Sequence, residues 1–232
     1  MDAAVPDRVT GRRPRLPTAA ELECVDAVYR LGTGTHAVSV AALARRLRET
    51  AAVASERVRA LETLGFVTAD PGGGVRLTAD GDRVACRLLR RHRVLERVFT
   101  DLLALPWERV HEEADRLTPV IADDVVDALA RLAGSPATCP HGNPIPSADG
   151  RIVEDTSVPL STLHAGECAI VVRIDREDSQ LLRYLAALGL LPDTKLAVEE
   201  VGVFGGPILV SVGAARYALG RNVASRIRVR TV

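Results

Sequence analysis

The sequence lacks the features that define several large classes of protein. It contains no run of about eighteen apolar residues, so we expect no membrane span. Its amino-terminal arginines are not followed by an apolar segment, which argues against a secretory signal and favours the cytoplasm. The four cysteines are scattered without a Cys-x-x-Cys pair, which argues against a disulfide framework or a zinc knuckle. No His-Glu-x-x-His or nucleophile motif occurs, so we expect no enzyme, and a metal hydrolase is the least favoured function.

An excess of one charge is also absent overall, yet the charges are unevenly distributed. Residues 1–100 carry seventeen arginines against twelve acidic residues, a surplus of five, so the remaining 132 residues of this neutral chain carry a net charge of −5. A basic front suits a protein whose amino-terminal part meets a polyanion. Lys195 is the only lysine, and we attach no functional weight to the preference for arginine.

The first part of the chain predicts an arm followed by a helix. Residues 1–17 hold three prolines and four arginines, which predicts a flexible arm. A helix is expected over residues 18–31, because Thr18 and Glu21 form a capping box ahead of an apolar stripe. Glu23 and Asp26 lie three residues apart beside that stripe.

Residues 39–67 predict two short helices with a break between them. Ser39 caps the first helix, and small alanines begin the second, which lets this helix approach a groove or its partner helix closely. Arg57 and Arg59 point away from its apolar stripe, where they could reach phosphates or base edges. The pattern fits a helix-turn-helix, and by itself it fits a helical hairpin without a DNA-binding role about as well.

A β-hairpin is expected next, because two short apolar runs flank the turn sequence Asp-Pro-Gly-Gly-Gly. A helix-turn-helix followed by a hairpin is the winged-helix arrangement, which tips the balance toward DNA binding. Arg76 on the hairpin is placed to meet the DNA backbone. We therefore expect a winged-helix DNA-binding domain over residues 18–80.

Residues 91–115 carry the strongest candidate for a metal site. His92 and Glu96 lie four residues apart, one helical turn along the same face, and His111 and Asp115 repeat that spacing on the next helix. The proline-containing turn between them would fold the second helix back on the first. Imidazole and carboxylate suit a divalent ion such as Fe, Mn, Co, Ni or Zn. The alternative is a pair of helical ion pairs, which are common and weakly stabilising.

Three amphipathic helices are expected around this stretch, over residues 79–104, 107–118 and 121–133. Such helices after a DNA-binding head usually form a dimer interface, which matches a palindromic site. We assign residues 81–142 to a helical dimerisation and metal-binding domain and residues 143–160 to a linker. Cys139 and His141 lie where prolines and glycines replace periodic structure, without a second ligand pair nearby, so we expect no metal role for them.

The pattern changes to short strands after residue 160. Five apolar or alternating runs and one helical segment, SQLLRYLAALGLL, predict a small barrel of the SH3 type over residues 161–232. The expected fold class is α+β, with a winged helix-turn-helix, an all-helical dimerisation domain and an SH3-like β-barrel.

The order of these parts and several strings resemble the diphtheria toxin repressor family of metal-dependent regulators. The strings are RRHRVLERVFTDLLAL, WERVHEEADRL and CPHGNPIPSADG, and the resemblance covers residues 18–232. The segment LLRYLAALGLLPDTKLAV resembles the ferrous-transport-A type of SH3 domain, and the chain looks most similar to the manganese-regulator branch. The resemblance implies a homodimeric repressor of metal homeostasis genes that binds double-stranded DNA at a palindromic operator. The implied cofactor is Mn²⁺ or Fe²⁺, with Co²⁺, Ni²⁺ or Zn²⁺ as surrogates.

The family implies two metal sites per subunit. The ancillary site draws on the two helices and the barrel, at positions that match His92, Glu96, His111, Asp175 and Asp178, with Glu177 as a competitor in the barrel loop. The primary site matches Glu23, Asp26 and Asp115.

Two further ligand positions of the primary site depart from the family pattern. They carry Thr118, a poor ligand, and Pro119, which has no ligating side chain. This departure keeps an alternative open, in which an eroded primary site leaves a protein that binds DNA independently of metal or responds to another ligand.

The DNA-contact positions of the family also differ here. They fall on Thr50, Ala52, Ser55 and Glu56, and Glu56 repels phosphate but can accept a hydrogen bond from a cytosine amine. A different operator sequence is therefore implied. The candidate DNA-binding residues are Ser39, Thr50, Ala52, Ser55, Glu56, Arg57, Arg59 and Arg76.

Overall fold

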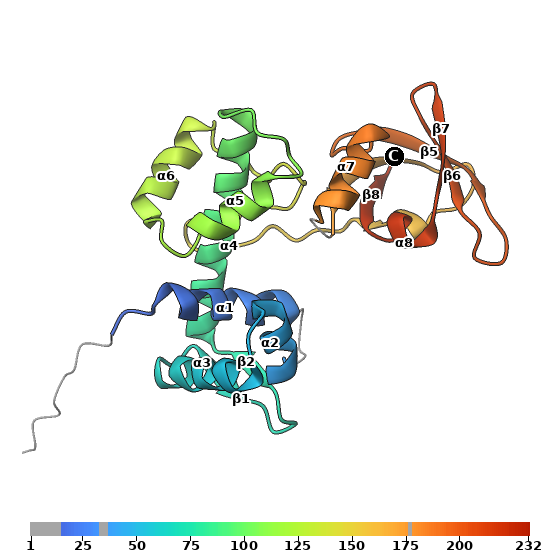
Figure 1. The fold of residues 1–232 in the computed structure, drawn as a ribbon. Coiled ribbons are helices and arrows are strands. Elements are labelled where there is room, and N and C mark those ends of the chain that lie inside the picture. Colours follow the sequence, from blue (N-terminus) through green and yellow to red (C-terminus); the bar gives the residue numbers. More distant parts are fainter. Residues whose placement is uncertain (1–14, 33–36, 176–177) are drawn as a thin grey trace, which may run out of the picture. The chain divides into compact units, whose positions relative to one another are not determined.

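The computed structural model describes residues 15–32, 37–175 and 178–232, and it divides into two compact units, Met1–Ala85 and Cys86–Val232 (Figure 1). Most of the expected arm, residues 1–14, and the competing ligand Glu177 lie outside the described residues. Within the described ranges, every helix is too short or too polar to cross a membrane.

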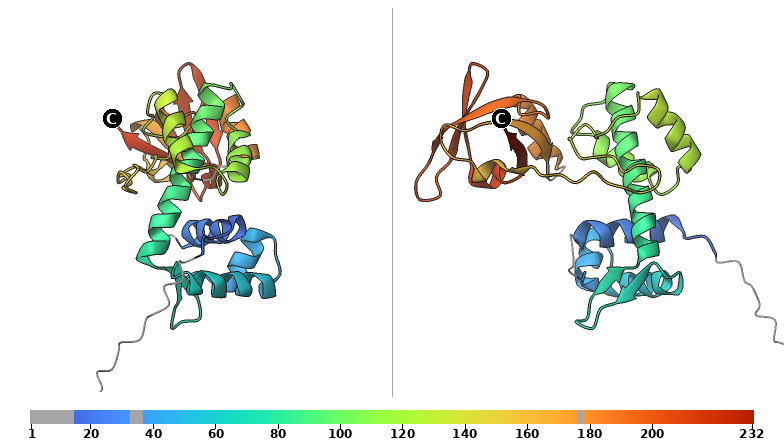
Figure 2. Two further views of the ribbon diagram at one scale, coloured as in Figure 1. Left: turned by 90° about the vertical axis from the view of Figure 1, so that its left-hand side faces the viewer. Right: turned by 180° about the vertical axis from the view of Figure 1, so that it is seen from behind.

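The amino-terminal unit is a winged helix. Its elements are α1 (Ala19–Leu31), α2 (Val40–Leu47), α3 (Ala51–Thr63), β1 (Val67–Ala69) and β2 (Val75–Leu77), and two further views are given in Figure 2. The three helices enclose an apolar core in which Val25, Leu43 and Leu61 are fully buried. The antiparallel β1–β2 hairpin pairs Thr68 with Arg76. The expected helix-turn-helix and wing are confirmed.

Side-chain caps fix where the helices of this unit begin. Thr18 accepts from the backbone N–H of Glu21, whose side chain binds the backbone of Thr18 in return, as the capping box predicts. Ser39 and Thr50 accept from backbone N–H groups in the first turns of α2 and α3. Arg48 follows α2 with a left-handed backbone (φ 56°), which ends that helix and turns the chain toward α3.

The second unit begins within the long helix α4 (Ala79–Asp101) and continues with α5 (Val110–Leu117) and α6 (Asp123–Leu132). Apolar side chains from all three helices form one core, among them Leu95, Val110 and Val126. α5 begins later than the expected residue 107, because Trp107 packs against the apolar core of the carboxy-terminal sheet. Burial of this large ring against the sheet is favourable, and it holds the chain at Trp107 outside the helix.

The carboxy-terminal part is a six-stranded antiparallel sheet with strand order β3-β8-β4-β5-β6-β7. The strands are β3 (Val158–Pro159), β4 (Cys168–Ile174), β5 (Lys195–Val201), β6 (Ile208–Val212), β7 (Ala215–Leu219) and β8 (Ile227–Thr231). The 3₁₀ turn η1 (Leu160–Thr162) and the helices α7 (Ser179–Ala187) and α8 (Arg221–Ala224) complete it. Register shifts at Val171/Arg173 and Val198/Glu200 bend the sheet. All five strands expected from the sequence are present, and the additional short strand β3 lies in the segment expected to be a linker.

Candidate metal centre and recognition helix

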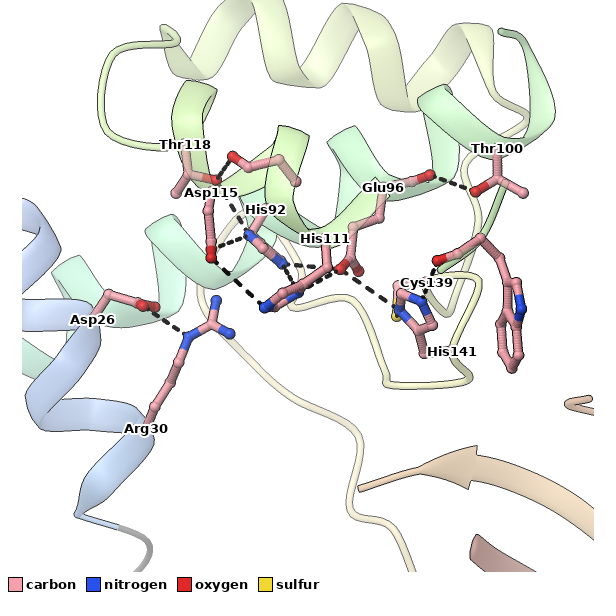
Figure 3. A network of polar contacts seen from close by, with 12 residues as sticks. Asp26, Arg30, His92, Glu96, Thr100, His111, Asp115, Thr118, Cys139 and His141 are labelled. Carbon is pink, nitrogen blue, oxygen red and sulfur yellow. Dashed lines mark hydrogen bonds and ion pairs between the residues drawn. The ribbon is translucent and has the colours of Figure 1, made fainter. Parts of the chain in front are cut away.

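A triangle of ligand atoms forms between α4 and α5 (Figure 3). Nε2 of His92 lies 2.9 Å from Oε1 of Glu96 and 3.0 Å from Nδ1 of His111, and the latter two atoms are 3.0 Å apart. Each of the two nitrogens carries at most one proton, and one proton makes one good hydrogen bond. Two hydrogen bonds at most can therefore form, so hydrogen bonds alone do not satisfy all three contacts. A cation bound at about 2.1 Å by each donor imposes donor separations of about 3.0 to 3.4 Å. The structure thus brings together the three ligands expected on the two helices.

Glu96 dominates the electrostatics of this triangle. Its side chain is 0% exposed, and its Oε2 atom is buried without a hydrogen-bond partner among the described residues. Burial alone would raise the pKa of Glu96, but the charge of His92 and hydrogen bonds from the surrounding histidines hold that pKa well below its usual value. An ionised carboxylate with an unused buried oxygen is unfavourable unless a cation satisfies it.

Asp115 contacts the outer side of both imidazole rings. Its Oδ1 atom lies 3.3 Å from Nδ1 of His92, and its Oδ2 atom lies 3.6 Å from Nε2 of His111. These are the nitrogens that do not belong to the triangle. A carboxylate on the far nitrogen of a ligating histidine fixes the tautomer and increases the basicity of the ring. The geometry therefore gives Asp115 an orienting position beside the triangle.

A second group of ligand atoms shares Glu96 with the triangle. Glu96, Cys139 and His141 form this group, and all three residues are fully buried. Nδ1 of His141 lies 3.6 Å from Oε1 of Glu96 and 3.9 Å from Sγ of Cys139. Nε2 of His141 lies 2.8 Å from the carbonyl oxygen of Trp107, and this contact requires a proton on Nε2. Nδ1 therefore donates toward Glu96 when the ring is protonated and offers a lone pair when the ring is neutral. The sequence prediction gave Cys139 and His141 no metal role, because it did not anticipate that Glu96 lies against them.

Arginines of α4 hold the loop that carries Cys139 and His141. Guanidinium groups donate to loop carbonyls in the pairs Arg90–Pro146, Arg93–Pro144 and Arg97–Thr138. Because arginine stays protonated at all ordinary pH values, these donors are permanent. The loop is therefore fixed along the helix that carries His92 and Glu96.

The same loop also lies against β4. The backbone N–H of Ile174 donates to the carbonyl of His141 at 3.0 Å. Gly142 has φ +85°, and a Cβ atom there would lie 2.0 Å from the carbonyl oxygen of Val172. Only glycine fits this approach and this backbone conformation. The buried group around Glu96 is thus connected to both the helices and the sheet.

The two ligands expected from the barrel lie outside both groups. Asp175 follows β4 and pairs with Arg173. Asp178 caps α7 by accepting two backbone N–H groups, each at 3.0 Å. Their carboxylates are therefore engaged in local contacts.

The remaining positions of the family's primary site are divided between the two units. Glu23 and Asp26 lie on α1 of the amino-terminal unit, where Asp26 forms an ion pair of 2.7 Å with Arg30. Thr118, at the end of α5, is buried and donates its hydroxyl to the carbonyl of Ala114 at 2.8 Å. This contact uses the only proton of the hydroxyl within its own helix.

Hydroxyl groups among the candidate DNA-binding residues serve α2 and α3 themselves. Ser39 and Thr50 cap these helices by accepting backbone N–H groups. Oγ of Ser55 donates to the carbonyl of Ala51 at 2.8 Å. The hydroxyls of Ser39 and Thr50 thus determine where the recognition motif begins.

The candidate arginines fall into two kinds. Arg57 pairs with Glu49 and is 20% exposed, and Arg76 pairs with Asp70 on the wing and is 41% exposed. Arg59 is exposed on α3 and forms no ion pair within the described part of the chain. Arg59 is therefore more available to a ligand than Arg57, a distinction that the sequence alone did not reveal.

Two family models match the chain. Residues 78–147 match the model described as iron dependent repressor, metal binding and dimerisation domain, and residues 158–231 match the FeoA domain. The first match contains the complete triangle and the loop with Cys139 and His141, and the second contains the whole six-stranded sheet.

Full-length relatives are also found. The iron-dependent repressor IdeR of Mycobacterium tuberculosis is 30% identical over 208 residues, covering 83% of this chain and 88% of its own length. The diphtheria toxin repressor of Corynebacterium glutamicum is 34% identical over 200 residues, with 83% and 87% coverage. A solved manganese-dependent transcriptional repressor in complex with manganese has a TM-score of 0.83 at 32% identity, covering 91% of this chain and 100% of that one.

Proposed function

The chain belongs to the iron-dependent repressor and diphtheria toxin repressor family, and from that premise we propose that it is a homodimeric, metal-dependent repressor of metal homeostasis genes. It is not an enzyme, because this family consists of transcriptional repressors. It binds double-stranded DNA through the winged helix, and we propose a palindromic operator. We place its action in the cytoplasm, where a repressor of this family would meet DNA.

The observation that carries this proposal is the triangle at Glu96. Three donor atoms lie within 3.0 Å of one another, and the second oxygen of the same buried carboxylate lacks a partner among the described residues. This arrangement suits a bound cation better than any set of hydrogen bonds. We propose His92, Glu96 and His111 as ligands, with Asp115 orienting the two rings.

The donor chemistry limits the choice of ion. Two imidazoles and a carboxylate suit Mn²⁺ or Fe²⁺ as the regulatory ion, and Co²⁺, Ni²⁺ or Zn²⁺ could replace it in vitro. We propose that Glu96, Cys139 and His141 provide a second position on the same carboxylate, where the thiolate would favour softer ions. The bound ion would supply positive charge that joins α4, α5 and the loop.

The other expected ligands remain part of the proposal. Glu23 and Asp26 would contribute a carboxylate pair from α1, and Asp175 and Asp178 would contribute from the carboxy-terminal domain after giving up their local contacts. Metal would act on DNA binding by drawing these carboxylates to the ion and so changing the arrangement of the helices and domains that carry them. Metal tightens DNA binding only if it prefers the DNA-competent arrangement, and DNA must then tighten metal binding by the same factor.

Exposed apolar residues on α5, on α6 and in the turn between them support a homodimer. Val120 is 68% exposed and Leu132 is 69% exposed, and Leu117 and Val125 are each more than 40% exposed. A dimer interface would remove these apolar side chains from water, which is favourable. The match to a dimerisation domain covers these residues.

A gel-shift titration on the promoter of the gene itself tests the proposal. The full chain is titrated with Mn²⁺ present and again after complete chelation. A His92→Ala variant is compared with a His164→Ala control, since His164 is 87% exposed and belongs to neither group. We expect metal-dependent binding for the wild type and the control, and none for His92→Ala. Equal binding after chelation would contradict metal dependence.

One observation favours a second candidate function, metal-independent repression. Thr118 offers only a neutral hydroxyl, and Pro119 has no donor side chain, so the primary site of the family lacks two strong ligands. Calorimetry separates the two candidates. The second candidate, in which the metal is structural, would be favoured if metal binds in a single step and operator affinity is the same with and without metal.

A further inference from the structure

The exposed face of α3 carries one acidic side chain at its centre. Ala54, Val58 and Leu61 form the buried stripe of this helix. With about 3.6 residues per turn, Glu56 lies on the side opposite that stripe. Ala52, one turn earlier, is exposed on the same side and its small side chain leaves room for close approach.

The carboxylate of Glu56 is available to bind a ligand. Thr50 and Ser55, the neighbouring hydroxyl residues, are engaged with the backbone of α3. Within the described residues Glu56 forms no ion pair or hydrogen bond through its side chain, and it is exposed. A carboxylate on the face of a helix that enters DNA weakens binding through repulsion from the phosphates, unless the carboxylate accepts a hydrogen bond from a donor in the groove.

Base edges in the major groove offer such donors on cytosine and adenine. The amine of adenine stands beside the N7 lone pair, which repels a carboxylate, whereas the amine of cytosine has no acceptor beside it on its own base. Cytosine is therefore the favourable partner. Arg59, three residues after Glu56 and exposed, adds a positive charge that offsets repulsion from the phosphates.

We propose that Glu56 determines operator specificity by selecting a cytosine at one position of each half-site. This assignment rests on the proposed repressor function. It concerns the base sequence that the dimer prefers and is independent of which metal activates it.

Selection from a randomised duplex library tests the assignment. The full chain is used with Mn²⁺, and wild type is compared with Glu56→Gln, Glu56→Ala and the matched control Glu62→Gln. Glu62 is exposed on the same helix but lies four residues after Val58, beside the buried stripe. Circular dichroism verifies that each variant is folded.

Wild type and Glu62→Gln are expected to select the same cytosine with about a tenfold preference. Glu56→Gln is expected to select adenine at that position, because a glutamine amide pairs with the N6 and N7 atoms of adenine. Glu56→Ala is expected to accept any base there.

An unchanged base preference in Glu56→Gln and Glu56→Ala, with binding intact, would overturn the assignment and leave the repressor function standing. Enrichment of no duplex by the wild type, with or without Mn²⁺, would overturn the repressor function and this assignment together.

Discussion

Oε1 of Glu96 lies 3.6 Å from Nδ1 of His141, although α5 and α6 separate the two residues along the chain. This contact joins a loop to the triangle of His92, Glu96 and His111. The two groups of ligands consequently have one carboxylate in common. A substitution in the loop should therefore alter metal binding by the helices.

Replacing Cys139 by serine should remove the sulfur donor while preserving the fold. We expect the Co²⁺-loaded wild type to show a thiolate-to-cobalt charge-transfer band in the near ultraviolet, and Cys139→Ser to lack it. Cys168→Ser is the matched control, because Cys168 is an exposed cysteine on β4. A band that persists in Cys139→Ser and disappears in Cys168→Ser would contradict the proposed second position.

Fluorescence of Trp107, the only tryptophan, should report metal binding near His141. The two ring centroids are 5.4 Å apart, and a paramagnetic ion at Nδ1 of His141 would quench the indole. We expect Mn²⁺ or Co²⁺ titration to quench the wild type, with a weaker apparent affinity in Cys139→Ser, which loses the sulfur donor grouped with His141. The control His164→Ala should titrate like the wild type.

Gly142→Ala should destabilise the loop more than Gly134→Ala does. Both glycines have positive φ, +85° and +79°, but a Cβ at Gly142 would collide with the carbonyl of Val172 whereas Gly134 has open space. Backbone strain alone should cost about 1 kcal/mol at Gly134, and the collision should add about 1 to 3 kcal/mol at Gly142. Urea denaturation measures both values, and equal losses would show that the close approach to β4 does not stabilise the protein.

Stability should depend on the ionisation of Asp155 at acidic pH. Burial raises the pKa of Asp155, but hydrogen bonds from Arg173 and Ser157 outweigh it and lower that pKa to about 2. Because an unfolded aspartate has a pKa of about 3.9, the stabilisation is present above about pH 4 and is lost as the pH falls toward 2.

The corresponding variant is Asp155→Asn, with the exposed neighbour Glu154→Gln as its control. We expect Asp155→Asn to lose about 1 kcal/mol at neutral pH, a value reduced for solvent screening of this partly exposed pair. The difference from wild type should shrink below about pH 4. Urea denaturation at several pH values checks this, and a difference that stays constant with pH would exclude ionisation of Asp155 as its source.

Leu132→Asp should weaken the dimer. Leu132 is 69% exposed on α6, and a charge in an apolar interface lacks a partner and is strongly unfavourable. Analytical ultracentrifugation should show a monomer, with weaker operator binding as a result. Val203→Asp is the control, since Val203 is 75% exposed on the β5–β6 turn, and monomer formation in both variants would argue against a specific role of α6.

The sequence predicted elements well where local patterns determine them. Capping residues such as Thr18 and Ser39 gave the helix starts, and alternating apolar residues gave the strands. The His92–Glu96 spacing gave two of the three residues of the triangle, because residues four apart on a helix lie on one face. The start of α5 was predicted too early, since the position of Trp107 depends on a sheet formed some fifty residues later.

Contacts between distant segments were not predictable in the same way. Nothing near Cys139 and His141 in the sequence indicates that Glu96 lies against them, because tertiary packing creates this contact. The pairing of Arg57 with Glu49 had the same origin, so the sequence ranked Arg57 and Arg59 equally. Local spacing identified individual candidate ligands, whereas the sharing of one carboxylate between two groups required the fold.

The arginine contacts along α4 bear on how quickly the protein responds. Glu96, Cys139 and His141 are fully buried, and the loop above them is tied down by Arg90, Arg93 and Arg97. An ion held by this group would leave as the loop opens, and opening requires that these bonds break. The residence time of the ion would then depend on how often the loop opens. When metal becomes scarce, repression would persist until the loop has opened, and the equilibrium affinity does not determine the length of that interval.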